Sequence, residues 1–99
     1  MIFWMSDDTD RIMTECGIAV YGFDPEKDGA NAECILELSD DRSVTVRLGD
    51  VRGMSAEGID RLFREKVRET ADGTGDVEIS AVAEALERGG AEAPWVFAA

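Results

Sequence analysis

Residues 33–48 have the sequence ECILELSDDRSVTVRL, which carries the clearest structural pattern in the chain. Apolar and polar residues alternate on both sides of a short polar segment, Ser39-Asp40-Asp41-Arg42. Alternation with a period of two places successive side chains on opposite faces of a strand. We therefore predict a β-hairpin with strands over 33–38 and 43–48 and one buried face, formed by Cys34, Leu36, Leu38, Val44, Val46 and Leu48. On the other face, Glu33 and Glu37 lie on the strand opposite Arg47, which predicts a cross-strand ion pair.

Elements on both sides of this hairpin follow from the apolar pattern. Residues 16–23, CGIAVYGF, form an apolar run bounded by turn-forming residues, which predicts a further buried strand. After the hairpin, the apolar period becomes that of a helix. One apolar stripe covers residues 55–70, with Ser55 as a suitable N-cap. A second stripe covers residues 78–88, and we expect Gly89-Gly90 to end that helix.

Strands followed by helices are typical of an α+β fold in which helices cover an antiparallel sheet. We predict a three- or four-stranded antiparallel sheet with two amphipathic helices packed on one face. Residues 94–97, PWVF, supply either the fourth strand or an aromatic tail. A chain of 99 residues has the length of one domain. We place this single α+β domain over residues 11–99 and predict that residues 1–10 form a flexible N-terminal arm.

The chain is strongly acidic, and the acidic residues are unevenly distributed. Asp and Glu outnumber Lys and Arg by 22 to 10, for a net charge of −12. Residues 1–41 contain 11 acidic and 2 basic residues, whereas residues 42–70 contain 5 and 7. Hydrophobic residues make up 44% of the chain, so the charge does not imply disorder, which also needs low hydrophobicity.

The leading functional hypothesis comes from this charge. A negative surface steers a protein with a basic surface, and spaced carboxylates can imitate the phosphates of a nucleic acid. We therefore predict a non-catalytic binding protein, an inhibitor or antidote of a nucleic-acid-binding protein such as some phage anti-defence proteins. The residues assigned to partner binding are Asp24, Glu26, Asp28, Glu33, Glu37, Asp40 and Asp41. The first alternative is a structural or dimer-forming domain from a halophile, whose acidity serves only solubility.

Three arginines, Arg61, Arg64 and Arg68, fall on one face of the first predicted long helix, opposite its apolar stripe. Glu57 precedes Arg61, and Asp60 precedes Arg64, by one helical turn, which favours ion pairs. Proteins that bind nucleic acids usually have basic domains, so we predict no direct nucleic-acid binding. We assign the three arginines instead to contact with a partner or with a second copy, which would make a homodimer.

Residues 69–84, ETADGTGDVEISAVAE, have the Asp and Gly content of a calcium-binding EF-hand loop. No register supplies the glutamate needed at its last position, so a weak divalent-cation binder is only a further alternative, and we assign no metal ligands. The chain has no histidine and two cysteines, Cys16 and Cys34, which we expect to be buried free thiols. Without a nucleophile elbow or a phosphate-binding loop, neither an enzyme nor a cofactor is predicted.

Four aromatic residues lie near the chain ends, and we expect them to complete the core rather than form an exposed contact patch: Phe3, Trp4, Trp95 and Phe97. The apolar run over residues 1–5 is too short for a signal sequence and has no basic flank. No run approaches the ~20 apolar residues of a membrane span. A cytoplasmic protein without membrane contact is the expectation.

Overall fold

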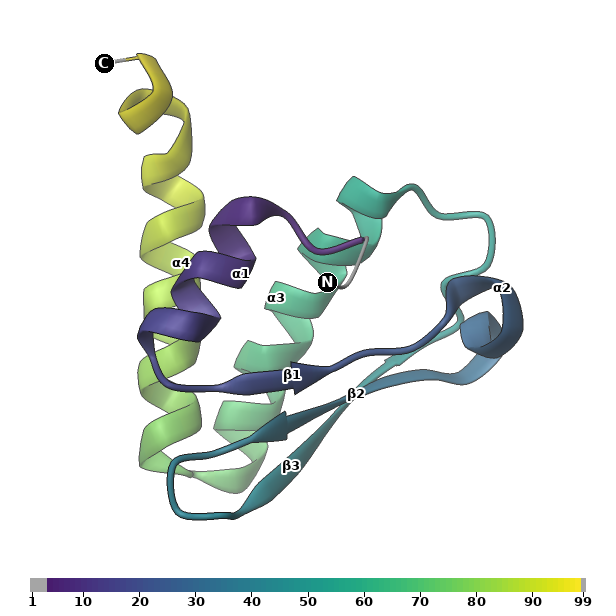
Figure 1. Ribbon diagram of the computed structural model, residues 1–99, viewed down its shortest axis with the longest axis horizontal. Helices are drawn as coiled ribbons and strands as arrows, with labels where there is room; N and C mark the ends of the chain where they lie inside the picture. The colour runs from purple at the N-terminus through teal and green to yellow at the C-terminus, as the bar shows by residue number, and fades with distance from the viewer. Residues whose placement is uncertain (1–3, 99) are drawn as a thin grey trace.

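The computed structural model describes residues 4–98, and the side chains as far as residue 89. Its elements are α1 (Asp7–Glu15), β1 (Ala19–Tyr21), α2 (Pro25–Asp28), the 3₁₀ turn η1 (Gly29–Asn31), β2 (Ala32–Glu37), β3 (Ser43–Gly49), α3 (Ala56–Thr74) and α4 (Val77–Ala98). The three strands form one antiparallel sheet in the order β1-β2-β3 (Figure 1). The predicted α+β class and antiparallel sheet are therefore confirmed.

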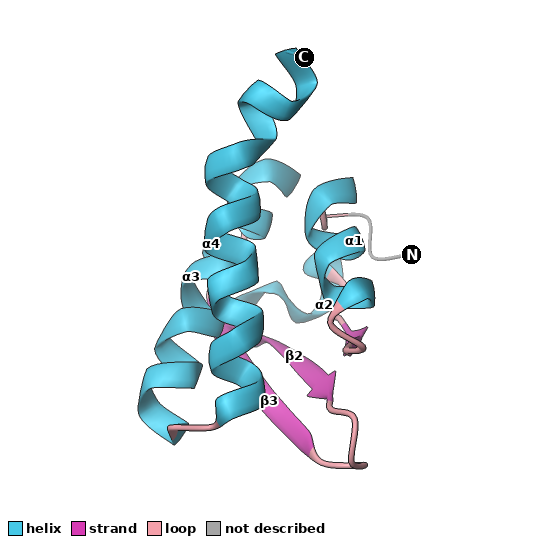
Figure 2. Cartoon of the chain, turned by 90° about the vertical axis from the view of Figure 1, so that its left-hand side faces the viewer, coloured by secondary structure: helices cyan, strands magenta, loops and turns pink. Residues whose placement is uncertain are grey.

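The predicted hairpin is formed by β2 and β3, with the expected alternation of buried and exposed residues. Cys34, Leu36 and Val46 are fully buried, whereas Ile35 is 42% exposed. α3 contacts both β3 and α4, and α4 contacts α1. Figure 2 shows these three helices beside one another, with the strands of the hairpin below them. None of the described helices is both long and apolar enough to cross a membrane.

Residues 4–10 differ from the flexible arm expected over residues 1–10, and residues 1–3 lie outside the described part. Trp4 and Met5 are buried, and α1 begins at Asp7. Ser6 is the N-cap of this helix, since its side chain accepts a hydrogen bond from the backbone N–H of Thr9. Acidic residues in the first turn favour the positive end of the helix dipole, and the buried side chains of α1 fix it to the core. Of the four terminal aromatics, Trp4 lies in the core, and the side chains of Phe3, Trp95 and Phe97 lie outside the described part.

The strand expected over residues 16–23 is shorter, because β1 covers only Ala19–Tyr21. Cys16 is the C-cap of α1, and Gly17 has a φ of 74°, in the left-handed region that glycine adopts without strain. The start of the apolar run therefore ends a helix rather than extending a strand.

The two apolar stripes of the predicted helices are buried as expected, and they form the core with the inner face of the sheet: Ile59, Phe63 and Val67 of α3, and Ile79, Val82, Ala83 and Leu86 of α4. Ser55 caps α3 by accepting a hydrogen bond from the Gly58 N–H. Gly75, with a φ of 66°, follows the end of α3.

The predicted end of the second long helix at Gly89-Gly90 is wrong, because α4 continues to Ala98. A methyl group at Gly89 would collide with Cδ1 of Ile12 on α1. Glycine therefore allows α1 and α4 to approach closely at this point instead of ending α4. Residues 94–97 likewise lie in α4 and form neither a fourth strand nor an irregular tail.

Candidate protein-binding face

The outward face of the sheet is exposed to solvent, and we call it the open sheet face. Tyr21 and Ile35 are paired in register between β1 and β2, and Thr45 of β3 lies on the other side of Ile35. Tyr21 is 55% exposed and Ile35 is 42% exposed. The full set of exposed residues on this face is Ala19, Tyr21, Glu33, Ile35, Glu37, Ser43, Thr45 and Arg47. Two adjacent apolar side chains thus lie uncovered at its centre.

Acidic side chains flank this apolar centre on β2. Glu33 and Glu37 lie two residues before and after Ile35, so all three point to the same face. The predicted cross-strand pair is present, with Glu33 Oε2 3.7 Å from Arg47 Nε. The hydroxyl of Tyr21 donates to Glu37 Oε2 at 3.3 Å. Exposed contacts of this kind contribute little free energy, so both carboxylates remain able to exchange them for contacts with a partner.

The other predicted acidic residues lie at the two ends of β2. Asp24 caps α2, since its Oδ1 accepts a hydrogen bond from the Glu26 N–H at 2.9 Å, and Asp28 ends the same short helix. Asp40 and Asp41 lie in the turn between β2 and β3, and Asp41 has a φ of 63°. Figure 1 shows α2 and this turn at opposite ends of the hairpin, separated by the six residues of β2, about 20 Å. The seven predicted residues therefore follow β2 from end to end instead of forming one compact patch.

The hairpin turn is attached to the turn between α3 and α4 by Arg42. Its guanidinium contacts Asp40 at 2.7 Å, Asp76, and Glu78 at 3.4 Å. The hydrogen bonds from Arg42 lower the pKa of the Asp40 and Asp76 carboxyl groups. Asp40 is therefore held within the protein's own ion pairs. The sequence does not reveal which residues Arg42 reaches, because Asp76 lies 34 positions further along the chain.

Asp76 also explains why residues 69–84 do not form a calcium loop. Its Oδ1 accepts hydrogen bonds from the N–H groups of Glu78 and Ile79, which caps α4. Only Gly75 and Asp76 separate α3 from α4, so the acidic residues of this segment are divided between two helices and a tight turn. Over residues 4–89, no three Cys, Asp or Glu side chains gather in an arrangement able to hold a metal ion.

The three arginines of α3 do not form a common contact surface. Arg61 is exposed and pairs with Glu57 at 3.1 Å, as predicted from their spacing. Arg64 points inward, where its Nε donates to Thr9 Oγ1 at 2.9 Å and its Nη1 donates to the Leu86 carbonyl at 3.2 Å. Arg68 joins α3 to α4 through two hydrogen bonds with Glu87, at 2.7 and 3.0 Å. Two of the three side chains are thus engaged between helices, because α4 packs beside α3 and Thr9 of α1 reaches Arg64.

Asp60 is the centre of a buried polar cluster. Its carboxylate accepts hydrogen bonds from the Ser6 N–H at 2.8 Å and the Thr9 hydroxyl at 3.1 Å, and it lies 3.5 Å from Arg64 Nε. Asp60 is 8% exposed and Thr9 is fully buried. This cluster joins α1, α3 and α4, so its role is structural.

Neither cysteine is activated for nucleophilic chemistry. Both are free thiols, with Cys34 buried in β2 and Cys16 half-buried at the end of α1. Burial raises the pKa of Cys34 to about 12 and also raises that of Cys16, so both remain protonated near neutral pH. Comparison of the chain with protein-family models, with curated proteins and with solved structures gives no match.

Proposed function

We propose that this protein is a non-catalytic binding module that recognises a basic protein partner through the open sheet face. Tyr21 and Ile35 are the apolar contacts, and Glu33 and Glu37 pair with cations of the partner. The single observation that supports this role is an exposed aromatic and aliphatic pair between two carboxylates on an uncovered sheet. Tyrosine is enriched among the residues that contribute most to binding energy at interfaces.

The acidic loops extend this surface. Asp24, Glu26 and Asp28 lie beyond one end of β2, and Asp40 and Asp41 lie beyond the other. Spread over such a length, carboxylates suit an elongated basic surface, such as the groove of a nucleic-acid-binding protein, and increase the rate of encounter. An inhibitor or antidote of such a protein is the version of the function that we favour.

Affinity capture from the source cell, followed by titration of each captured protein, tests the proposal. The charge variant is Glu33→Gln/Glu37→Gln, and its matched control is Glu65→Gln/Glu84→Gln, which removes the same charge from exposed positions on α3 and α4. We expect a captured protein with a basic surface whose affinity falls about tenfold or more in the first variant and stays unchanged in the second.

The apolar contacts are tested in the same way. Tyr21→Ser/Ile35→Ser removes the centre of the open sheet face, and Met54→Ser/Val77→Ser removes the two other large hydrophobic side chains exposed in the described part. The proposal fails if both pairs weaken binding equally. It also fails if every captured protein responds only to salt concentration, since that result would favour an acidic surface that serves solubility.

A further inference from the structure

β3 is a free edge of the sheet, and it is long enough to pair with another strand. It has seven residues, whereas the opposite edge, β1, has three. The Leu38 N–H donates to the Arg42 carbonyl at 2.8 Å, so Leu38 and Arg42 are a hydrogen-bonded pair of the antiparallel ladder. Along such a ladder, hydrogen-bonded pairs alternate with pairs that are not hydrogen-bonded. It follows from the register that the backbone groups of Val44 and Val46 point toward β2, while those of Ser43, Thr45 and Arg47 point away from the sheet.

Little protects this edge. Proteins commonly block exposed edges with proline, bulges, charges or very short strands. β3 has no proline, and the irregularity in its pairing with β2 lies at the C-terminal end of β3, opposite Ala32 and Glu33. Arg47 is the one charged side chain on the strand.

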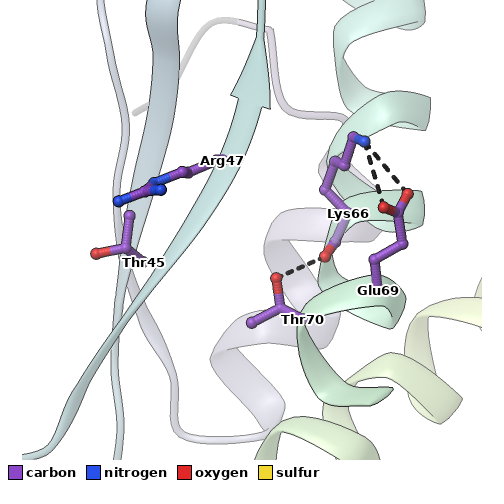
Figure 3. Close-up of a pocket in the computed structure, with 5 residues that line it drawn as sticks. All are labelled: Thr45, Arg47, Lys66, Glu69 and Thr70. Atoms are coloured by element: carbon purple, nitrogen blue, oxygen red, sulfur yellow. Dashed lines mark hydrogen bonds and ion pairs between the residues drawn. The ribbon is translucent and has the colours of Figure 1, made fainter. Parts of the chain in front are cut away.

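A groove of about 350 Å³ runs along this edge, between β3 and α3 (Figure 3). Thr45 and Arg47 line it on one side, and Lys66, Glu69 and Thr70 line it on the other. Figure 3 shows the side chains of Thr45 and Arg47 pointing away from α3. The backbone of β3 therefore faces the groove. The N–H and C=O groups of Thr45 and Arg47, the two β3 residues that line it, point outward from the sheet.

We propose that this groove binds an extended peptide segment of a partner protein, which adds to β3 as a fourth strand of the sheet. Backbone hydrogen bonds to Thr45 and Arg47 supply most of the affinity in this mode of recognition, and alternate side chains supply the specificity. This proposal does not rest on the function assigned to the open sheet face, since its main contacts are with the outward backbone groups of β3 and not with the side chains of Tyr21 and Ile35.

The helix beside the groove favours a single strand over a second copy of this chain. Antiparallel pairing of two β3 strands would place both α3 helices on the same side of the joined sheet, each bordering the shared edge. Neighbouring strands lie about 4.8 Å apart, whereas packed helices need about 8–10 Å between their axes. An isolated strand avoids this conflict, because α3 then forms one wall of its site.

The charges of the groove indicate an acidic segment. Arg47 is 84% exposed in its side chain, and its contact with Glu33 is long, at 3.7 Å. Lys66, which lies 3.3 Å from Glu69, is the cation on the α3 side of the groove, and the Arg47 side chain lies on the open sheet face, in a chain whose net charge is −12. Side chains of an added strand alternate between the α3 wall and the open sheet face. An acidic residue facing the wall meets Lys66, and one on the other face meets Arg47.

Selection from a random twelve-residue peptide display library tests the proposal, with each enriched peptide then titrated by fluorescence polarisation. Thr45→Pro removes an outward N–H without touching the ladder to β2, and proline is tolerated on edge strands. Thr45→Val keeps the N–H and serves as the matched control. We expect acidic peptides whose affinity falls about tenfold in Thr45→Pro, stays within about threefold in Thr45→Val, and weakens in Lys66→Gln.

Amide chemical shifts of the wild-type protein keep the test decisive if Thr45→Pro does not fold. On peptide binding, we expect the largest changes at Ser43, Thr45 and Arg47, with slower hydrogen exchange at the same three amides. The proposal is overturned if selection enriches no binder, or if the shifts move only on another surface. A concentration-dependent dimer whose formation is abolished by Thr45→Pro would also overturn it, because the occupant would then be a second copy.

Discussion

Replacing Asp60 by alanine should destabilise the fold strongly, because three groups depend on its carboxylate. The Ser6 N–H and the Thr9 hydroxyl donate to it at 2.8 and 3.1 Å, and Arg64 Nε lies 3.5 Å away. Among the described residues, no second carboxylate contacts any of these three groups, and Thr9 is fully buried. The substitution therefore leaves polar groups unsatisfied in the interior.

The magnitude follows from the burial of each group. A buried donor that loses its acceptor costs about 1–3 kcal/mol. Removing one partner of a fully buried ion pair costs about 3–5 kcal/mol. The side chain of Arg64 is 20% exposed and keeps its bonds to Thr9 and Leu86, so its share is smaller. We expect a total loss of about 3 kcal/mol for Asp60→Ala, a large fraction of the ~5–15 kcal/mol typical of a domain.

Urea unfolding followed by circular dichroism measures this loss. With a slope of about 1–1.5 kcal/mol per molar urea for a chain of this size, the midpoint should fall by roughly 2–3 M. Glu65→Ala, at an exposed position of α3, is the control and should change stability by less than about 0.5 kcal/mol. If Asp60→Ala shifts the midpoint no more than Glu65→Ala, the cluster contributes nothing measurable and the reasoning is wrong.

Four further predictions concern the packing, the two thiols and the charge. Gly89→Ala should lower the free energy of unfolding by about 1 kcal/mol, since the collision with Ile12 outweighs the gain in helix propensity. In an Ile12→Val background the same substitution should be neutral or stabilising. Urea titration of the wild type, the two single variants and the double variant measures both effects. Cys34 should resist a thiol reagent at pH 8 far longer than Cys16, and equal rates would contradict its burial. Because the pKa of Cys34 is raised to about 12, its contribution to stability is complete below the ordinary value of 9.0 and is lost as the pH rises through 12. The melting temperature of Cys34→Ala should therefore fall less steeply with alkaline pH than that of the wild type. The protein should already be folded at low salt, since its carboxylates are widely paired with arginines. If it folds only near 2 M KCl, where the Debye length is below ~3 Å, the acidic surface is instead an adaptation to a salty solvent.

The parts of the fold set by local pattern were predictable from the sequence. Strict alternation predicted the hairpin and the pair between Glu33 and Arg47, and helical stripes predicted the buried faces of α3 and α4. Helix α1 was missed because it is short: its buried face consists of only Thr9, Ile12 and Met13, and its position depends on tertiary contacts. Gly89 was misinterpreted because the sequence does not reveal that a second helix packs against it.

The candidate site was predictable only residue by residue. Alternation placed Glu33, Ile35 and Glu37 on one face, but the exposure of Tyr21 depends on which residues of the preceding run form β1. The separation of the acidic loops does follow from the sequence, because one loop precedes β2 and the other follows it, so an extended strand lies between them. Helical spacing grouped the arginines, but only the positions of α1 and α4 determine that Arg64 and Arg68 turn toward neighbouring helices.

The packing of the N-terminal segment has a consequence for the order in which the chain folds. Ser6 and Thr9 bond to Asp60 and Arg64, which lie 51 to 55 positions later. Trp4 stacks on Phe23 at 5.3 Å and meets Phe63 at 5.4 Å between ring centroids. Contacts between segments so distant in sequence form slowly, because the loop must close before they stabilise anything. Ser6, Thr9 and Trp4 therefore reach their native places late in folding, although they precede α1 or lie within it, and a chain that ends before α3 has no core to receive them.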